Sequence, residues 1–156
     1  ASLVGSEMCI RDRYGTTGGA TCVSGAPNEV WSYTDQVCEI LSDYLRLRER
    51  MLPYITELME EAHEKGTPVM RPLFYDFPED KESWNVETEY MFGPKVLVKP
   101  ITDADARETD VYLPGGASWT NAWTGETFEG GQKVHVAAPI EQIPLFTRDG
   151  YKLPMK

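Results

Sequence analysis

The chain has 156 residues, a size that accommodates one ordinary domain or two small ones. Its hydrophobic content of 41% and aromatic content of 11% exclude an intrinsically disordered chain. The 25 acidic residues outnumber the 15 basic ones and give a net charge of −10, which argues against a nucleic-acid-binding protein because phosphate contacts need a basic surface. No run approaches about 18 apolar residues, so we expect no membrane span.

Cysteine and histidine do not indicate a metal or cofactor site. The 3 cysteines and 2 histidines form no Cys-x-x-Cys pair and no close Cys/His cluster. An odd number of cysteines also argues against a fold held together by disulfide bonds. We therefore expect no metal and no cofactor.

Residues 1–13 look like a sequencing artefact rather than native protein. Residues 2–12 read Ser-Leu-Val-Gly-Ser-Glu-Met-Cys-Ile-Arg-Asp and resemble the translation of a transposase-type library adapter. A secretory signal peptide is excluded, because charged residues interrupt what would have to be an apolar stretch. We expect this segment to lack fixed packing and the native N-terminus to be missing. The cellular location therefore stays open, with the cytoplasm slightly favoured.

A helical period begins after Thr34. Apolar residues recur every three or four positions and predict two helices, over about 35–52 and 53–65. Thr34 or the aspartate after it is the expected N-cap. Pro53 lacks an N–H and is expected to kink or divide the helical stretch. Gly66 is expected to end the second helix in the left-handed conformation.

Residues 68–75 read Pro-Val-Met-Arg-Pro-Leu-Phe-Tyr, a nearly continuous apolar run. Such a run predicts a strand buried on both faces, as in a parallel sheet. The strands that would flank it are not in this chain, so we expect it to lack at least one parallel neighbour and to leave apolar surface exposed. Arg71 must be paired or hydrogen bonded there, because a buried uncompensated charge costs several kcal/mol.

The rest of the chain has the pattern of a small β domain. After an acidic, turn-rich stretch at 76–93, with a short helix expected near 81–91, short strands alternate with glycine turns. The expected strands cover 95–100, 109–113, 118–121, 133–137 and 143–147. Because such strands pair locally through short turns, they predict an antiparallel sandwich over 94–150. Its expected core is Val96, Val98, Val111, Leu113, Trp123, Val136, Ile143 and Leu145.

Several strings, taken together, resemble glycoside hydrolase family 31, the α-glucosidases and α-xylosidases. They occur in the family's order, and Asn-Glu-Val-Trp-Ser at 28–32 is most similar to the α-xylosidase branch. The strings are Tyr-Leu-Arg-Leu-Arg-Glu-Arg-Met-Leu-Pro-Tyr at 44–54, Thr-Pro-Val-Met-Arg-Pro-Leu-Phe at 67–74, Glu-Tyr-Met-Phe-Gly at 89–93, Val-Tyr-Leu-Pro at 111–114, Trp-Thr-Gly at 123–125 and Ile-Pro-Leu-Phe at 143–146.

The resemblance implies an α+β chain made of the terminal helices and last strand of a (β/α)8 barrel, followed by a small antiparallel β-sandwich. In domain terms, residues 1–13 are the adapter-derived tail, 14–93 the C-terminal end of the catalytic barrel, and 94–156 the proximal C-terminal sandwich. Residues 68–75 then correspond to the eighth barrel strand. Lys99 departs from the family, which commonly has a small residue there; a long cation can snorkel, or the strand is less buried than expected.

The family's chemistry is retaining hydrolysis of an α-glycosidic bond by a pair of carboxyl groups about 5–5.5 Å apart. No position of this chain matches the motifs of the two family aspartates, so the resemblance assigns no catalytic residue here. Asp76, Glu79 and Asp80 follow the buried strand, but a solvated acidic turn is their favoured interpretation. We expect Asp103 and Asp105 to lie in a solvated loop.

Three residues are candidates for binding the substrate, an oligosaccharide or other α-glycoside that the resemblance places mainly in the missing upstream barrel. Arg71 is a candidate, although structural pairing is favoured for it. Glu29 and Trp31 are candidates near the barrel mouth, with loop anchoring favoured for the tryptophan. No nucleic-acid or membrane partner is expected, and the oligomeric state is open.

The sequence and the resemblance leave two alternative functions. The first is a C-terminal fragment of a retaining α-xylosidase or α-glucosidase, inactive by itself. The second is a non-catalytic carbohydrate-binding or scaffolding sandwich, which an exposed Trp119–Trp123 pair would favour. We assign Trp84, Trp119 and Trp123 to packing.

Overall fold

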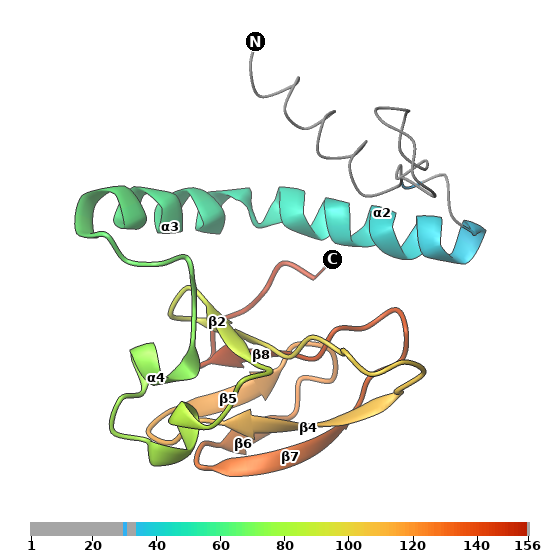
Figure 1. The fold of residues 1–156 in the computed structure, drawn as a ribbon. Coiled ribbons are helices and arrows are strands. Elements are labelled where there is room, and N and C mark those ends of the chain that lie inside the picture. Colours follow the sequence, from blue (N-terminus) through green and yellow to red (C-terminus); the bar gives the residue numbers. More distant parts are fainter. Residues whose placement is uncertain (1–29, 31–33, 156) are drawn as a thin grey trace, which may run out of the picture. The chain divides into compact units, whose positions relative to one another are not determined.

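The computed structural model describes residues 30 and 34–155 of the chain. Figure 1 shows how helices and strands succeed one another. The chain divides into two compact units, residues 1–48 and residues 49–156. The expectations for the adapter-derived segment 1–13 and for Glu29 and Trp31 lie outside the described residues.

Both expected helices are confirmed. Helix α2 (Asp35–Arg50) begins after Thr34, whose Oγ1 accepts a hydrogen bond from the Val37 N–H at 3.4 Å. Helix α3 (Leu52–Lys65) has Pro53 in its first turn, where a missing N–H costs nothing. It ends at Gly66, which takes the left-handed conformation with φ 71° and donates its N–H to the carbonyl of Ala62.

The expected parallel strand over 68–75 is wrong. Strand β1 comprises only Met70–Arg71 and pairs antiparallel with β2 (Tyr90–Phe92). Pro72 ends it, because a residue without an N–H cannot continue a ladder, and the short helix α4 (Leu73–Asp76) follows. The expected exposure of apolar surface is confirmed, with Met70 58% and Tyr75 44% exposed.

Two antiparallel sheets form the body of the second unit. The six-stranded sheet has the order β1-β2-β3-β8-β5-β6, and β4 pairs with β7 in a two-stranded sheet. A 3₁₀ helix, η2 (Lys81–Trp84), precedes β2, where the sequence predicted a longer helix. The remaining strands are β3 (Val96–Val98), β4 (Glu108–Leu113), β5 (Ser118–Asn121), β6 (Thr127–Glu129), β7 (Gln132–Ala137) and β8 (Leu145–Arg148).

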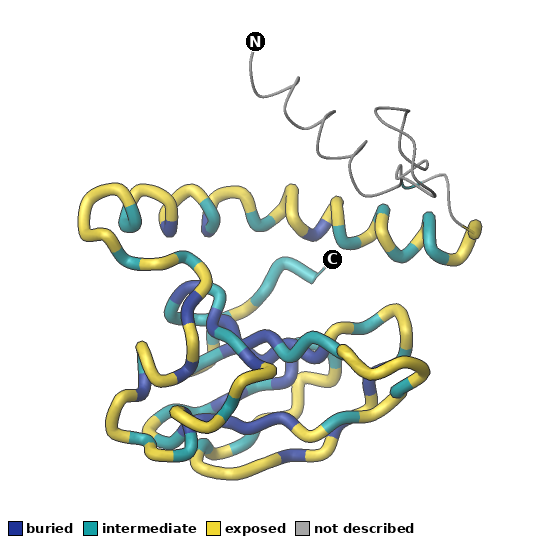
Figure 2. Tube along the Cα trace, in the orientation of Figure 1, coloured by how far each residue is buried: buried dark blue, intermediate teal, exposed yellow. Residues whose placement is uncertain are grey.

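Burial is greatest at the middle of the six-stranded sheet: β3 is buried throughout, β8 is buried except for Arg148, and β5 alternates between partly buried and buried residues (Figure 2). Because successive side chains of a strand point to opposite faces, Val96 and Val98 pack with Tyr54 and Leu58 of α3, whereas Leu97 belongs to the other cluster. That larger cluster joins residues of both sheets and of α4; its fully buried members are Leu73, Met91, Leu97, Val111, Leu113, Trp119 and Phe146.

The β domain differs from expectation in how its strands pair. Only β2–β3 and β5–β6 are hairpins of strands joined by a short connection, whereas β3–β8, β5–β8 and β4–β7 pair strands that are far apart in the sequence. Six of the eight expected core residues are buried, but Ile143 is 37% exposed and Trp123 is only partly buried. Strands β1 and β2 join the sheet from before residue 94, so the expected division at 93/94 falls inside one continuous sheet.

Candidate functional site

Arg71 is the one sugar-binding candidate that the structure describes. It leaves β1 with a side chain only 6% exposed, and its Nη1 lies 3.2 Å from Oδ1 of Asp76 at the end of α4. The guanidinium also lies over the Tyr75 ring, 5.2 Å from its centroid. Arg71 is therefore paired within this chain, the structural role that a buried cation needs.

The Arg71–Asp76 pair is not fully hydrogen bonded. Arg71 Nε and Asp76 Oδ2 are buried, and neither has a hydrogen-bond partner among the described residues. Burial raises the pKa of Asp76 above its usual value, and the positive charges of Arg71 and Arg148 partly oppose this effect.

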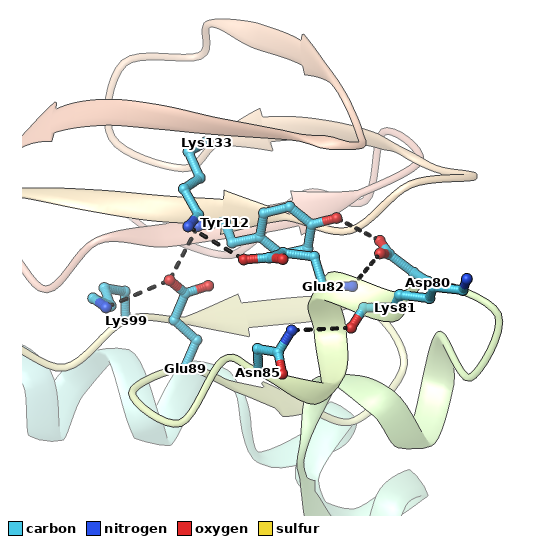
Figure 3. Close-up of polar contacts among 8 residues, drawn as sticks. All are labelled: Asp80, Lys81, Glu82, Asn85, Glu89, Lys99, Tyr112 and Lys133. Atoms are coloured by element: carbon cyan, nitrogen blue, oxygen red, sulfur yellow. Dashed lines mark hydrogen bonds and ion pairs between the residues drawn. The ribbon is translucent and has the colours of Figure 1, made fainter.

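Asp80 ties η2 to the β domain (Figure 3). Its Oδ1 accepts the Glu82 N–H at the start of η2, and its Oδ2 accepts the Tyr112 hydroxyl at 2.7 Å and the Gly115 N–H at 2.8 Å. Burial opposes ionisation, but these donors prevail and hold the pKa of Asp80 below its usual range. Both oxygens of Asp80 are thus occupied, and the solvated turn expected for it is wrong.

Glu89 and Lys99 form a second buried polar cluster, which also appears in Figure 3. Glu89 Oε1 accepts the Tyr112 N–H at 3.0 Å and lies 3.4 Å from Lys99 Nζ, while its Oε2 is buried without a partner among the described residues. Lys99 also donates to Thr88 Oγ1. Burial raises the pKa of Glu89, opposed by the Tyr112 N–H and by Lys99.

Sequence reasoning identified Lys99 as unusual but missed its partner. The β2–β3 hairpin pairs Tyr90 with Val98, so the next positions outward are Glu89 and Lys99. Glu89 and Lys99 carry opposite charges and lie at equal distances in sequence from the Gly-Pro turn. This spacing was the sequence signal that could have predicted their pairing across the hairpin. The Lys99 side chain is 13% exposed and ion paired, so the cation does not simply snorkel to solvent.

The other carboxylates considered in the sequence are exposed. Glu79, Asp103 and Asp105 lie at the surface, the last with φ 61° in the connection between β3 and β4. Of the five carboxylates considered, Asp76 is paired to Arg71 and Asp80 accepts three hydrogen bonds from within the chain.

A hollow of about 320 Å³ lies where the turns before β5 and after β6 meet Asp149. The Asp149 carboxylate accepts hydrogen bonds from the N–H and hydroxyl of Ser118, and it pairs with Arg148. The Asp149 carboxylate is therefore already engaged by groups of this chain. The lining residues are Gly116, Ala117, Ser118, Glu129, Gly130 and Asp149.

The tryptophans do not form an exposed pair on the sandwich. Trp119 is fully buried and donates its Nε1–H to the Pro114 carbonyl. Trp123 is partly buried and donates to the Ile143 carbonyl at 2.7 Å. Trp84, which the sequence assigned to packing, is instead 58% exposed and stacks on Phe74.

Two kinds of feature are absent from the part of the chain that the structure describes. No group of three or more His, Cys, Asp or Glu side chains is placed to hold a metal ion there. Within the same residues, no helix combines the length and the apolar character that crossing a bilayer requires.

Comparison with known proteins gives consistent matches. The profile of the glycosyl hydrolase family 31 C-terminal domain matches residues 66–153. An α-xylosidase of Saccharolobus solfataricus is 40% identical over 129 residues, which cover 83% of this chain and 18% of that protein. Alpha-glucosidase 2 of Bacillus thermoamyloliquefaciens is 39% identical over 122 residues, which cover 78% of this chain and 15% of that protein.

A solved structure matches as well. The crystal structure of a family 31 α-xylosidase from a soil metagenome, complexed with xylose, has a TM-score of 0.81 and 46% sequence identity. The match covers 86% of this chain and 20% of that one. This chain therefore corresponds to no more than about a fifth of the length of these relatives.

Proposed function

Because this chain belongs to glycosyl hydrolase family 31, we propose that it is the C-terminal fragment of a retaining α-glycosidase that hydrolyses α-xylosides or α-glucosides. The observation that carries the proposal is the profile match to residues 66–153, together with relatives named as α-xylosidase and α-glucosidase. Matches that cover about 80% of this chain but at most 20% of the relatives support its being a fragment.

The fragment is inactive by itself in this proposal. Retaining hydrolysis needs one carboxylate free to attack the anomeric carbon and a second carboxylic acid free to protonate the leaving oxygen. Asp76 pairs with Arg71, and Asp80 accepts hydrogen bonds on both oxygens, which supports structural roles for these two carboxylates. Binding a sugar without these groups gives no rate, because catalysis requires stabilisation of the transition state.

Glu29, Trp31 and Arg71 are the proposed sugar contacts of this fragment in its full-length protein. For Arg71, the 6% exposure of its side chain and its ion pair support a structural contribution ahead of direct contact. The alternative, a non-catalytic carbohydrate-binding module, has less support because Trp119 is fully buried in the core.

The inactivity is tested by incubating the purified chain with aryl α-xyloside and aryl α-glucoside and measuring phenol release. We expect no release above the buffer blank, with the α-xylosidase of Saccharolobus solfataricus as the active control. Turnover that disappears on Asp76→Ala, Glu79→Ala or Asp80→Ala would contradict the proposal and place an active site in this chain.

The family role is tested by a chimera. The matched segment of that α-xylosidase is replaced by the corresponding residues of this chain, which are 40% identical to it over 129 residues. We expect the chimera to hydrolyse aryl α-xyloside and the α-xylosidase truncated before the segment not to do so. A folded chimera without activity counts against the proposed function.

A further inference from the structure

Tyr112 on β4 is contacted by two carboxylates, one at its backbone and one at its ring (Figure 3). Its N–H donates to Glu89 Oε1 at 3.0 Å, and its hydroxyl donates to Asp80 Oδ2 at 2.7 Å. Glu89 directly precedes β2 of the six-stranded sheet, whereas Asp80 caps η2. Tyr112 is therefore the residue at which β4, the start of β2 and η2 are joined by polar contacts.

The negative charge of Glu89 is poorly compensated. Its side chain is only 3% exposed, and its one cationic contact is Lys99 Nζ, 3.4 Å from Oε1. Its Oε2 is buried without a hydrogen-bond partner among the described residues. A carboxylate in such a place loses hydration that one cation at this distance does not replace. Burial accordingly raises the pKa of Glu89, although the Tyr112 N–H and Lys99 act in the opposite direction.

The other charges close to Glu89 act on it more weakly. Lys133 on β7 also lowers the pKa of Glu89, but less than Lys99 does. Its Nζ lies 3.3 Å from an oxygen of Glu82 on η2, and the two side chains are 61% and 44% exposed. Solvent screens an exposed pair of this kind. Lys99 is therefore the main counter-charge of Glu89.

Asp80 is in the opposite situation. Its two oxygens share three donors, the N–H groups of Glu82 and Gly115 and the hydroxyl of Tyr112. These donors hold the pKa of Asp80 below its usual range, although burial opposes them. Two carboxyl groups on one tyrosine are thus placed in surroundings that shift their proton affinities in opposite directions.

We propose that Tyr112 is the centre of a two-step acid response, in which Glu89 takes up a proton first and releases Lys99, while Asp80 keeps η2 attached until the pH is much lower. In the first step a proton from water bonds to the Glu89 carboxylate at the unpartnered Oε2, and the Tyr112 N–H then donates to a neutral carboxyl group. Lys99 loses its counter-charge, and its long side chain extends its ammonium group towards solvent.

The first step does not unfold the domain. Because the pKa of Glu89 is higher in the folded chain than its ordinary value of 4.5, the folded state binds this proton more tightly than the unfolded chain does. The ionised form of Glu89 therefore lowers stability at neutral pH, and this effect disappears as the pH falls through the folded pKa. The second step has the opposite sign, since the stabilisation by ionised Asp80 is lost on protonation. The two groups thus separate an acid-induced change of contacts from acid unfolding.

The test is an NMR titration of the isotope-labelled chain from neutral to strongly acidic pH. It follows the side-chain carboxyl carbons of Glu89 and Asp80 and the amide proton of Tyr112. We expect Glu89 to titrate above its ordinary 4.5 and Asp80 below its ordinary 3.8. The Tyr112 amide should shift with the midpoint of Glu89, and the spectrum should remain that of the folded chain through this first step.

Lys99→Met removes the main counter-charge and should raise the midpoint of Glu89 by about 1 pH unit, with the midpoint of Asp80 unchanged. Lys65→Met is the matched control, because Lys65 is an exposed lysine that pairs with Glu61 on α3; it should leave both midpoints unchanged.

Equal midpoints for Glu89 and Asp80, the reverse order, or a Tyr112 amide that does not follow Glu89 would overturn the inference. Loss of the folded spectrum together with the protonation of Glu89 would also overturn it, since no separate first step would then exist. The titration of the unchanged chain decides these outcomes even where Lys99→Met does not fold. It also requires no glycosidase activity, so its result is independent of the proposed function.

Discussion

Two tryptophans on neighbouring parts of the β domain have opposite surroundings. Trp119, on strand β5 between β8 and β6, is fully buried, donates its Nε1–H to the Pro114 carbonyl and lies near Phe77 in the core. Trp84, at the end of η2, also has its Nε1–H satisfied by a carbonyl, yet 58% of the residue is exposed. The polar end of each ring is satisfied in the same way, so the difference lies in the apolar surface, which only Trp119 removes from water.

The comparison separates a region whose large apolar side chains are buried from a region whose large apolar side chains are exposed. In the larger core cluster, the apolar side chains of both sheets are buried by residues of this chain, as expected of a close-packed core. The segment from β1 to η2 has satisfied many of its polar groups but leaves apolar rings at the surface. Substitutions in the two regions should therefore differ in how much they destabilise the isolated chain.

The largest effect is expected for Trp119→Ala. Removing a fully buried indole leaves a cavity in the core, and the free energy of unfolding should fall by about 3–5 kcal/mol. Trp84→Ala in the isolated chain should cost only about 1 kcal/mol, because it loses one aromatic stack and one exposed hydrogen bond. Urea denaturation of the two variants measures both values, and equal losses would contradict the comparison.

An intermediate effect is expected for Asp80→Asn, which changes the group that joins the two regions. An amide cannot accept all three hydrogen bonds that Asp80 accepts from Glu82, Tyr112 and Gly115. The loss should be about 2–3 kcal/mol at neutral pH. Tyr112→Phe is the matched control; it removes one of the three donors and should cost less.

The effect of Asp80 on stability should depend on pH in a defined direction. Its pKa is lower in the folded chain than its ordinary value of 3.8, so its stabilisation is fully present above that value. It is lost as the pH falls through the folded pKa. Unfolding curves recorded between neutral and strongly acidic pH should therefore converge for the wild type and Asp80→Asn at the acidic end; a constant difference would contradict this account.

The smallest effect is expected at the fully exposed His135 on β7. Hydrogen bonds to Asp110 and Glu108 raise its pKa, so its stabilisation is present below the ordinary pKa of 6.5 and disappears as the pH rises through the raised value. His135→Gln should remove this pH dependence and change stability little, because exposed ion pairs contribute little. A large loss at alkaline pH, where the histidine is neutral, would show that its role is not electrostatic.

Most short-range features were predictable from the sequence because their causes are local. The cap at Thr34, the division at Pro53 and the left-handed Gly66 depend on a few adjacent residues, and the structure confirms all three. Strand β5 has the predicted bounds, since β-forming residues lie between glycine turns. The family resemblance rested on strings of residues, and the profile match confirms it.

The candidate site was less predictable, because its pairs join residues from different elements. Arg71 was expected to be paired, and its partner Asp76 lies only five positions away across the end of β1 and α4. Asp80 was interpreted as a solvated turn residue, since nothing near it in sequence reveals the Tyr112 hydroxyl, 32 positions away. A separation of 23 positions likewise hid the contact between Glu89 and the Tyr112 N–H.

By itself, then, the sequence determined about where the two long helices α2 and α3 begin and end, where most strands lie, and the family to which the chain belongs. Only the tertiary structure decided that β1 pairs antiparallel with β2, that β3 and β5 lie on either side of β8, and which charged groups are buried together. The physical reason is the range of the interactions. Caps and turns are governed by backbone chemistry within a few residues, whereas strand order and the burial of Trp119 or Glu89 are decided by segments that meet only once the sheet is formed.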